Sequence, residues 1–265
     1  MHNHQPDMED RGMKGIIFCK RTMKEILRDP LSYIFCLAFP LVMLVIMSVV
    51  NESIPKQANM TVFQIRNLAP GIAYFGLTFI MLFICIQVSK DRSTALVMRL
   101  HASPMKSKDF ILGYTLSVIV LALLQLLITF AASFATAVAV GTKLPVTGVL
   151  LSIVCLLPSA IMFISVGMIF GTLIGEKAAP GICSIIITVV GMVGGVWMDV
   201  DNMKGVILSV SRVFPFYHGV KLARLALAGE YAEMGQPLLV VCAWMLGLYL
   251  LAIAVMNGKL KKDTY

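Results

Sequence analysis

The sequence predicts an all-α integral membrane protein that crosses the bilayer six times. Of its 265 residues, 58% are hydrophobic and only 14% are charged, whereas a soluble domain carries about 25% charged residues. The charges are also unevenly placed, which leaves six long stretches without Asp, Glu, Lys or Arg. A helix of about 20 apolar residues crosses a hydrocarbon layer of about 30 Å, and every stretch is at least that long. The predicted spans lie within residues 30–51, 67–89, 110–142, 144–175, 178–198 and 234–258.

Residues 1–30 are predicted to form an N-terminal region that ends in an amphipathic helix. Apolar and basic positions fall on opposite faces at helical spacing, so we expect this helix to lie in the membrane interface, and Pro30 ends it. A basic flank that only sets topology is the alternative. The start of the chain is polar and acidic, so no cleaved signal peptide is expected. The apolar positions are Ile16, Cys19, Met23 and Ile26, and the basic ones are Lys20, Arg21, Lys24 and Arg28.

Residues 31–258 are predicted to form the membrane domain. Pro40 in span one and Pro158 in span four each remove a backbone hydrogen bond and favour a kink. Spans three and four are longer than a membrane requires, so they tilt or project beyond it. Small residues at every fourth position predict close helix packing, within the bundle or between subunits. These residues are Ala131, Ala135 and Ala139 in span three, Gly167, Gly171 and Gly175 in span four, and Gly191 and Gly195 in span five.

The segment 199–233, before the last span, is predicted to be more than an external loop. Apolar residues precede and follow Pro215, interleaved with Arg212, Lys221 and Arg224. We expect two short amphipathic helices, hinged near Pro215, that rest on or dip into the outer interface. A plain surface hairpin is the alternative.

The basic residues predict the orientation of the chain in the cell membrane. They concentrate before span one, in the loop 90–109 between spans two and three, and in the tail 259–265. With the single lysine between spans four and five, this side carries 15 of the 22 basic residues. Basic loops prefer the cytoplasm, so both termini are predicted to be cytoplasmic. Anionic lipids account for the net charge of +8 without a nucleic-acid partner.

Several kinds of chemistry are missing from the sequence. The spans have no ionisable residue at membrane depth, as a proton- or sodium-coupled carrier would need. Because no HExxH, GxSxG or P-loop pattern occurs, we predict no catalytic residue, metal site or bound cofactor, and any ATP must bind another polypeptide. The cysteines form no CxxC pair and are expected to be free thiols. They are Cys19, Cys36, Cys85, Cys155, Cys183 and Cys242.

The loop 90–109, with the sequence KDRSTALVMRLHASPMKSKD, is the most unusual polar stretch. Residues 93–100 are predicted to form a short helix with Asp91 near its positive end and Arg99 near its negative end, stopped at Pro104. A stiff charged helix between two spans could pass a push from a soluble partner into the bilayer. A charged loop that only fixes topology is the alternative.

With these features, the chain resembles the permease subunits of ATP-binding-cassette exporters of the type-2 class. The resemblance covers nearly the whole chain. It rests on the N-terminal helix, the six spans, the acidic-Arg loop ending in Ser103-Pro104, and the segment Pro215-Phe216-Tyr217-His218 with Leu222-Ala223-Arg224. Asp91 stands where family members often have Glu, and Leu96 or its neighbours stand in place of a glycine. These departures concern the docking geometry of the loop and not the fold.

The resemblance implies roles for particular residues. The loop would be the coupling helix that docks on a separate ATPase subunit, which binds ATP and Mg, and the N-terminal helix would lie at the same interface. Pro215, Tyr217 and Arg224 would belong to the external helices. The residues given a coupling role are Asp91, Arg92, Arg99 and Pro104, with Lys20, Arg21 and Lys24 on the N-terminal helix.

The predicted function is that of a half-transporter, paired with a second copy or a homologue, that exports a drug, an antimicrobial peptide or a lipid-like molecule. The apolar pathway would offer polar contacts from Tyr74, Thr78, Gln125, Thr129 and Ser133. For these residues the alternative is structural, because hydroxyls in spans often bond to the preceding turn and Gln125 could simply join helices. A passive channel, or a membrane sensor that docks a cytoplasmic partner, is the alternative function.

Overall fold

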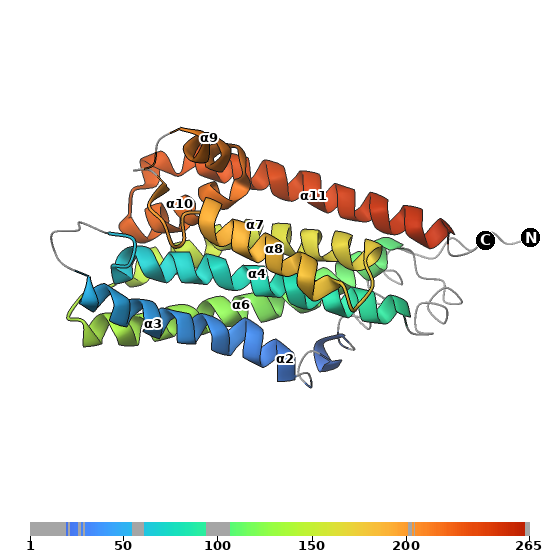
Figure 1. Ribbon diagram of the computed structural model, residues 1–265, viewed down its shortest axis with the longest axis horizontal. Helices are drawn as coiled ribbons and strands as arrows, with labels where there is room; N and C mark the ends of the chain where they lie inside the picture. Colours follow the sequence, from blue (N-terminus) through green and yellow to red (C-terminus); the bar gives the residue numbers. More distant parts are fainter. Residues whose placement is uncertain are drawn as a thin grey trace, which may run out of the picture.

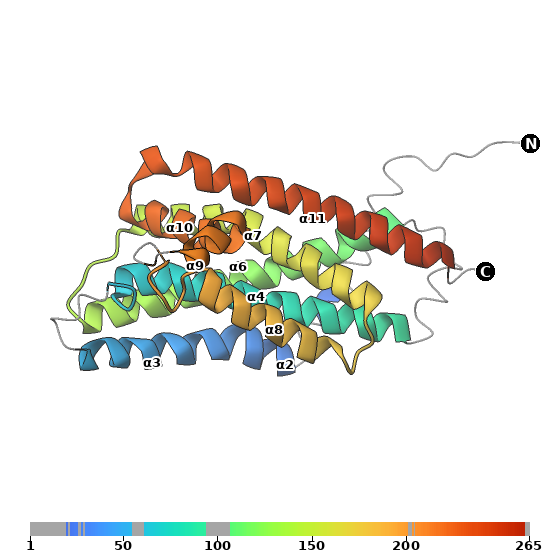
Figure 2. The same ribbon diagram turned by 45° about the horizontal axis from the view of Figure 1, so that its top comes forward.

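The computed structural model describes residues 20, 22–25, 28, 30–54, 61–93, 107–200, 203 and 205–262, and these contain helices and no strand. The long helices run side by side in one elongated bundle (Figures 1 and 2). The elements are α2 (Pro30–Tyr33), the π-helix η1 (Ile34–Ala38), α3 (Phe39–Ser53), α4 (Ile65–Ser93), α6 (Ser107–Ala139), α7 (Val146–Leu173), α8 (Ala179–Val193), α9 (Val206–Val213), α10 (Pro215–Ala228), the 3₁₀ turn η4 (Tyr231–Glu233) and α11 (Gly235–Lys262).

The predicted all-α, polytopic membrane fold is confirmed. Within the described residues, five helices are long and apolar enough to cross a membrane. Helix α6 has the same length of 33 residues as the predicted run 110–142 but begins and ends three residues earlier, and α11 continues beyond the last charge-free run to Lys262. The five candidate spans are Ile34–Ser53, Ile65–Arg92, Ile111–Ala139, Val146–Leu173 and Gly235–Lys259.

The fifth predicted span is the exception. Its charge-free run covers residues 178–198, but α8 has only 15 residues and ends at Val193, so it rises about 22 Å, short of a hydrocarbon layer of about 30 Å. Gly195 has a φ of +75°, which favours glycine and turns the chain away from the helix axis. A Cβ on Gly191 would lie 2.7 Å from Nε1 of Trp197, so the chain after the turn folds back against α8.

The two prolines that were predicted to favour kinks lie in different surroundings. Pro40 is the second residue of α3, and the π-helical turn η1 lies immediately before it. A π-turn accommodates the missing hydrogen bond by changing the helical repeat. In contrast, Pro158 lies inside α7, which continues as one α-helix to Leu173.

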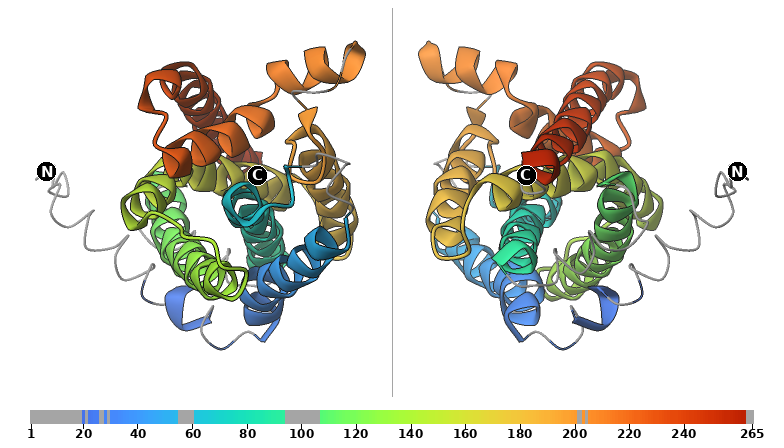
Figure 3. Two further views of the ribbon diagram at one scale, coloured as in Figure 1. Left: turned by 90° about the vertical axis from the view of Figure 1, so that its left-hand side faces the viewer. Right: turned by 90° about the vertical axis from the view of Figure 1, so that its right-hand side faces the viewer.

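Helix α4 forms the centre of the bundle, and its neighbours surround it when the bundle is viewed from the end (Figure 3). Its closest contact is with α7. A Cβ on Gly167 would lie 2.5 Å from the backbone oxygen of Met81, and one on Gly171 would lie 2.7 Å from that of Cys85. The prediction of close packing is confirmed for these two glycines.

Gly175 and the three alanines behave differently. A Cβ on Gly175 would meet no heavy atom within 4 Å, so this glycine takes no part in the contact with α4. Ala131, Ala135 and Ala139 are exposed on α6. Packing within this chain therefore does not explain the alanine repeat.

The predicted external segment contains two helices joined at Pro215, but they differ in depth. The alternative of a plain surface hairpin is wrong, because α10 packs inside the bundle against α7 and α4, with Leu222, Ala223 and Ala226 fully buried. The hydroxyl of Ser152 on α7 donates a hydrogen bond of 2.9 Å to the Ala223 carbonyl. By contrast, α9 projects from the bundle (Figure 3).

Candidate coupling site at the end of α4

The loop 90–109 begins in the last turn of α4. We call this end of the bundle, where α4 and α7 finish and α6 begins, the loop end. Arg92 reaches across to α7, where Nη1 donates to the carbonyl oxygens of Thr172 and, at 3.3 Å, Gly171. The hydroxyl of Ser89 donates to the carbonyls of Gly171 at 3.2 Å and Ile174 at 2.8 Å.

These bonds satisfy groups that the helix itself leaves open. The last carbonyls of an α-helix have no partner within the helix, and they carry the negative end of its dipole. A hydroxyl and a guanidinium from α4 are suitable donors for them, and the guanidinium adds a favourable charge. The C-terminus of α7 is therefore held by the last turn of α4.

Asp91 ties the same turn to α6. Its side chain is 7% exposed, and the hydroxyl of Tyr114 donates to Oδ2 at 2.5 Å. A short bond to a carboxylate is stronger than one between neutral groups, particularly when buried. As a result, α4 and α6, the two helices that flank the loop, are joined at its base.

The N-terminal segment lies beside the same turns of α4. The amide of Gln87 donates to Oε2 of Glu25 at 3.2 Å. Thr22 is buried, whereas Lys20 and Lys24 are exposed. Residues 22–25 are helical, and Met23, the one predicted apolar position among them, is half-buried.

The predicted coupling residues thus divide into groups. Asp91 and Arg92 point into the bundle, where they hold α6 and α7, whereas Lys20 and Lys24 are exposed. Arg99, Pro104 and Arg21 lie outside the described residues, as does most of the predicted helix 93–100. A coupling role remains a prediction for all of them.

The partners of Asp91, Arg92 and the N-terminal segment carry little signal in the sequence. Ser89, Tyr114 and Glu25 are polar groups near the predicted membrane boundary, which is the only signal the sequence offers for them. The contacts of Arg92 join positions 79 and 80 residues apart, and no local spacing indicates them.

Replacing Tyr114 with Phe tests the bond to Asp91. Tyr114→Phe leaves a buried carboxylate short of one donor, and we expect the free energy of unfolding to fall by about 1–3 kcal/mol. The measurement is the melting temperature of the full chain in detergent. Tyr249→Phe is the matched control, because Tyr249 is half-buried on α11. An equal fall in both variants would contradict a special role for Tyr114.

The predicted substrate-contact residues lie in the interior of the chain. Thr78 and Ser133 donate to carbonyls of their own helices, at 2.6 and 2.8 Å. Gln125 on α6 donates to Thr129 at 3.1 Å and to the Ala73 carbonyl on α4 at 3.5 Å. These contacts fit the structural alternative, in which the hydroxyls bond within their helices and Gln125 joins two of them.

Tyr74 has a different environment. Its ring packs edge-on to that of Phe163, with centroids 5.4 Å apart, and it lies so close to α10 that a Cβ on Gly219 would be 2.2 Å from Cε2. Its buried hydroxyl has no hydrogen-bond partner in the described structure. Tyr74 therefore fills the contact between α4, α7 and α10.

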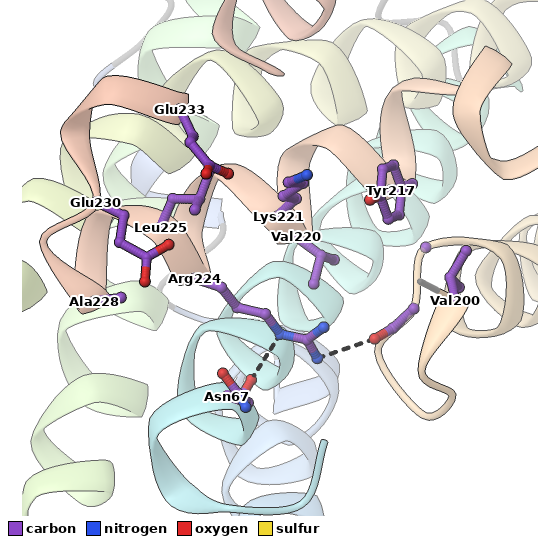
Figure 4. A pocket seen from close by; sticks show the side chains of 12 residues that line it. Asn67, Val200, Tyr217, Val220, Lys221, Arg224, Leu225, Ala228, Glu230 and Glu233 are labelled. Carbon is purple, nitrogen blue, oxygen red and sulfur yellow. Dashed lines mark hydrogen bonds between the residues drawn. The ribbon is translucent and has the colours of Figure 1, made fainter. Parts of the chain in front are cut away.

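At the opposite end of the bundle, α10 holds the other predicted residues. Pro215 begins α10, and Tyr217 is 7% exposed. Nε of Arg224 donates to the Asn67 carbonyl at 3.2 Å, and Nη2 donates to the Gly195 carbonyl at 3.0 Å (Figure 4). Arg224 thus ties α10 to the start of α4 and to the turn after α8.

The family to which the chain belongs follows from the geometry of the site and from a match to a family profile. Among the described residues, no group of His, Cys, Asp and Glu side chains has the arrangement of a metal site. A comparison with curated proteins finds no match. The family profile described as ABC-2 type transporter matches residues 15–227, which include the described N-terminal residues, the loop end and all but the last residue of α10. The chain therefore belongs to the ABC-2 type transporter family and is a multi-pass membrane permease.

Proposed function

We propose that this permease is the membrane half of an exporter in the cell membrane, driven by a separate ATPase subunit. Both termini and the loop 90–109 would lie in the cytoplasm, where the loop docks on the ATPase. Family membership supports the pairing with an ATPase, and the concentration of basic residues at the loop end supports the orientation. ATP and Mg would be bound by the ATPase subunit, whose hydrolysis supplies the energy.

The observation that carries the proposal is the bracing of the last turn of α4. Arg92 and Ser89 hold the end of α7, and Asp91 holds α6 through Tyr114. A displacement of the loop would therefore move three helix ends together. The close backbone contact of α4 with Gly167 and Gly171 would extend that movement along α7.

A second permease copy, or a homologue, would complete the transport pathway. Apolar side chains are exposed along α3 and α11, and the alanine repeat of α6 is exposed as well. In the membrane such faces contact lipid tails or another permease subunit, and small residues allow helices to approach closely.

The solute would be a hydrophobic or amphiphilic molecule, such as a drug, an antimicrobial peptide or a lipid-like compound. The charge-free runs of the sequence supply apolar walls and a few hydroxyl or amide groups. Such walls suit apolar solutes, whereas a pore for ions would need charged rings or exposed carbonyls.

Affinity purification of the full chain from its native membranes tests the proposal. We expect an ATPase subunit to co-purify, and we expect proteoliposomes of the complex to transport an amphiphilic dye only with ATP and Mg. Recovery of the permease without an ATPase, together with dye movement that needs no ATP, would contradict it. Dye movement without ATP would indicate a passive facilitator. Co-purification of an ATPase without any dye transport would indicate a sensor.

A further inference from the structure

A cavity of about 340 Å³ lies at the end of the bundle opposite the loop end. Its volume falls within the range of about 300–1,000 Å³ typical of small-ligand sites. The cavity lies between α10, the start of α4, the turn after α8 and the link from α10 to α11 (Figure 4). The side chains that give it charge are Lys221, Arg224, Glu230 and Glu233.

The cations stand on one face of α10. Tyr217, Lys221 and Arg224 are separated by four and three residues, which places them on the same side of a helix. Nζ of Lys221 lies 5.9 Å from the centroid of the Tyr217 ring, and two backbone carbonyls fix the guanidinium of Arg224. Both cations are half-buried, so water screens them less than it screens a surface charge.

The carboxylates reach the cavity because the chain reverses at Gly229. This residue has a φ of +83°, which favours glycine, and its N–H bonds to the Leu225 carbonyl at 2.9 Å. The N–H of Glu230 bonds to the same carbonyl at 3.1 Å. The turn thus brings Glu230 and Glu233 to the cavity lined by Lys221 and Arg224 (Figure 4).

The charges select a class of ligand. Two cations and two carboxylates give the lining a formal charge of zero, so a ligand with a net negative charge would meet repulsion from the carboxylates as well as attraction. A zwitterion with separated charges satisfies both pairs. Carboxylates bond best to an ammonium that carries N–H groups. A quaternary ammonium binds best to an aromatic face, but the Tyr217 ring already faces the Lys221 ammonium. These features favour a primary ammonium over a quaternary one.

We propose that this cavity binds a phosphoethanolamine group, with the phosphate on Lys221 and Arg224 and the ammonium on Glu230 and Glu233. The cavity lies where α4 begins, beside charged residues that end the apolar stretches, which is the depth of lipid headgroups. A phospholipid of the membrane is therefore the occupant we infer. The site goes beyond the proposed export function and does not depend on an ATPase.

Lipid retention by the full chain in nanodiscs tests the site. The discs contain phosphatidylcholine with equal parts of phosphatidylethanolamine and phosphatidylglycerol, and native mass spectrometry counts the lipids that stay bound. We expect the protein to retain phosphatidylethanolamine preferentially. Lys221→Gln should lower that retention about tenfold, the usual effect of losing a charged hydrogen bond. The matched control is Lys143→Gln, an exposed lysine at the same end that is outside the cavity.

A change in lipid preference after the two carboxylates are neutralised provides the sharper test. The double variant Glu230→Gln with Glu233→Gln leaves two cations in the cavity, so its preference should shift to anionic phosphatidylglycerol. An unchanged ratio of the two lipids in this variant would overturn the proposal. So would an equal loss of phosphatidylethanolamine in Lys221→Gln and Lys143→Gln. The ratio of the two lipids is measured within one folded sample, so a general loss of stability does not imitate its change.

The source of the headgroup is tested separately. Soluble glycerophosphoethanolamine is titrated into nanodiscs that contain only phosphatidylcholine. Saturable binding that Lys221→Gln abolishes would assign the site to a free headgroup, and retention of phosphatidylethanolamine alone would assign it to the lipid. Either result supports recognition of phosphoethanolamine, whereas the absence of both would overturn it.

Discussion

Arg92→Gln is expected to lower ATP-dependent transport about tenfold or more while the ATPase subunit still co-purifies. The guanidinium donates to two carbonyls at the end of α7, and losing charged hydrogen bonds at a half-buried position costs about 1.5–3 kcal/mol. Under the proposed function, a movement of the loop would then be transmitted less completely to α7. The measurement is dye transport by proteoliposomes together with ATP hydrolysis by the same samples.

The control for Arg92→Gln is Lys177→Gln. Lys177 is exposed and lies four residues beyond the end of α7, so its charge is near the same helix end without belonging to the brace. We expect Lys177→Gln to transport normally. Normal transport by Arg92→Gln, or an equal loss in both variants, would contradict the role of Arg92 in transmission.

Gly167→Ala is expected to destabilise the protein by about 1–3 kcal/mol, the usual cost of an extra methyl group in a close-packed contact. The new Cβ would lie 2.5 Å from the Met81 carbonyl oxygen and 2.2 Å from Cγ2 of Ile84. The backbone of α4 cannot move aside as a flexible side chain could, so α4 and α7 must separate. A lower melting temperature in detergent is the expected observation.

Gly175→Ala is the matched control for Gly167→Ala. It belongs to the same four-residue repeat, but no heavy atom lies within 4 Å of its added Cβ. We expect its melting temperature to remain close to that of the unaltered protein. If both variants melted at the same lowered temperature, the contact between α4 and α7 would not explain the effect.

The spans could largely be predicted from the sequence because insertion into lipid depends on the length and polarity of each stretch. Span five shows the limit of that argument. A charge-free run does not reveal where a helix ends, and α8 stops at Val193 because the chain turns at Gly194 and Gly195. The paired glycines were the available signal.

Depth within the bundle was harder to predict than the presence of a helix. The interleaved apolar and basic residues after Pro215 correctly predicted the helix α10, and they suggested an interfacial position. Lys221 and Arg224 instead line a cavity, while Leu222, Ala223 and Ala226 pack inside the bundle. The same pattern suits a helix beside lipid or beside a polar cavity, so only tertiary contacts distinguish the two.

At the candidate coupling site, too, the position of the segment could be predicted but the contacts of its side chains could not. The sequence located the loop and its charged base, because charges between two spans are conspicuous. It did not show that Asp91 and Arg92 point inward, since their partners on α6 and α7 are far away in the chain. Likewise, Thr78 and Ser133 offered hydroxyl groups to a predicted pathway, but their hydrogen bonds go to their own helices.

Coupling to a cytoplasmic ATPase requires the loop end to face the cytoplasm, and labelling of introduced cysteines on intact cells tests this orientation most directly. In a chain whose own six cysteines are replaced, Arg99→Cys and Lys143→Cys are treated with a membrane-impermeant maleimide. We predict that Lys143→Cys reacts on intact cells and that Arg99→Cys reacts only after the membrane is opened. Labelling of Arg99→Cys on intact cells, with Lys143→Cys protected, would contradict the proposed coupling to a cytoplasmic ATPase.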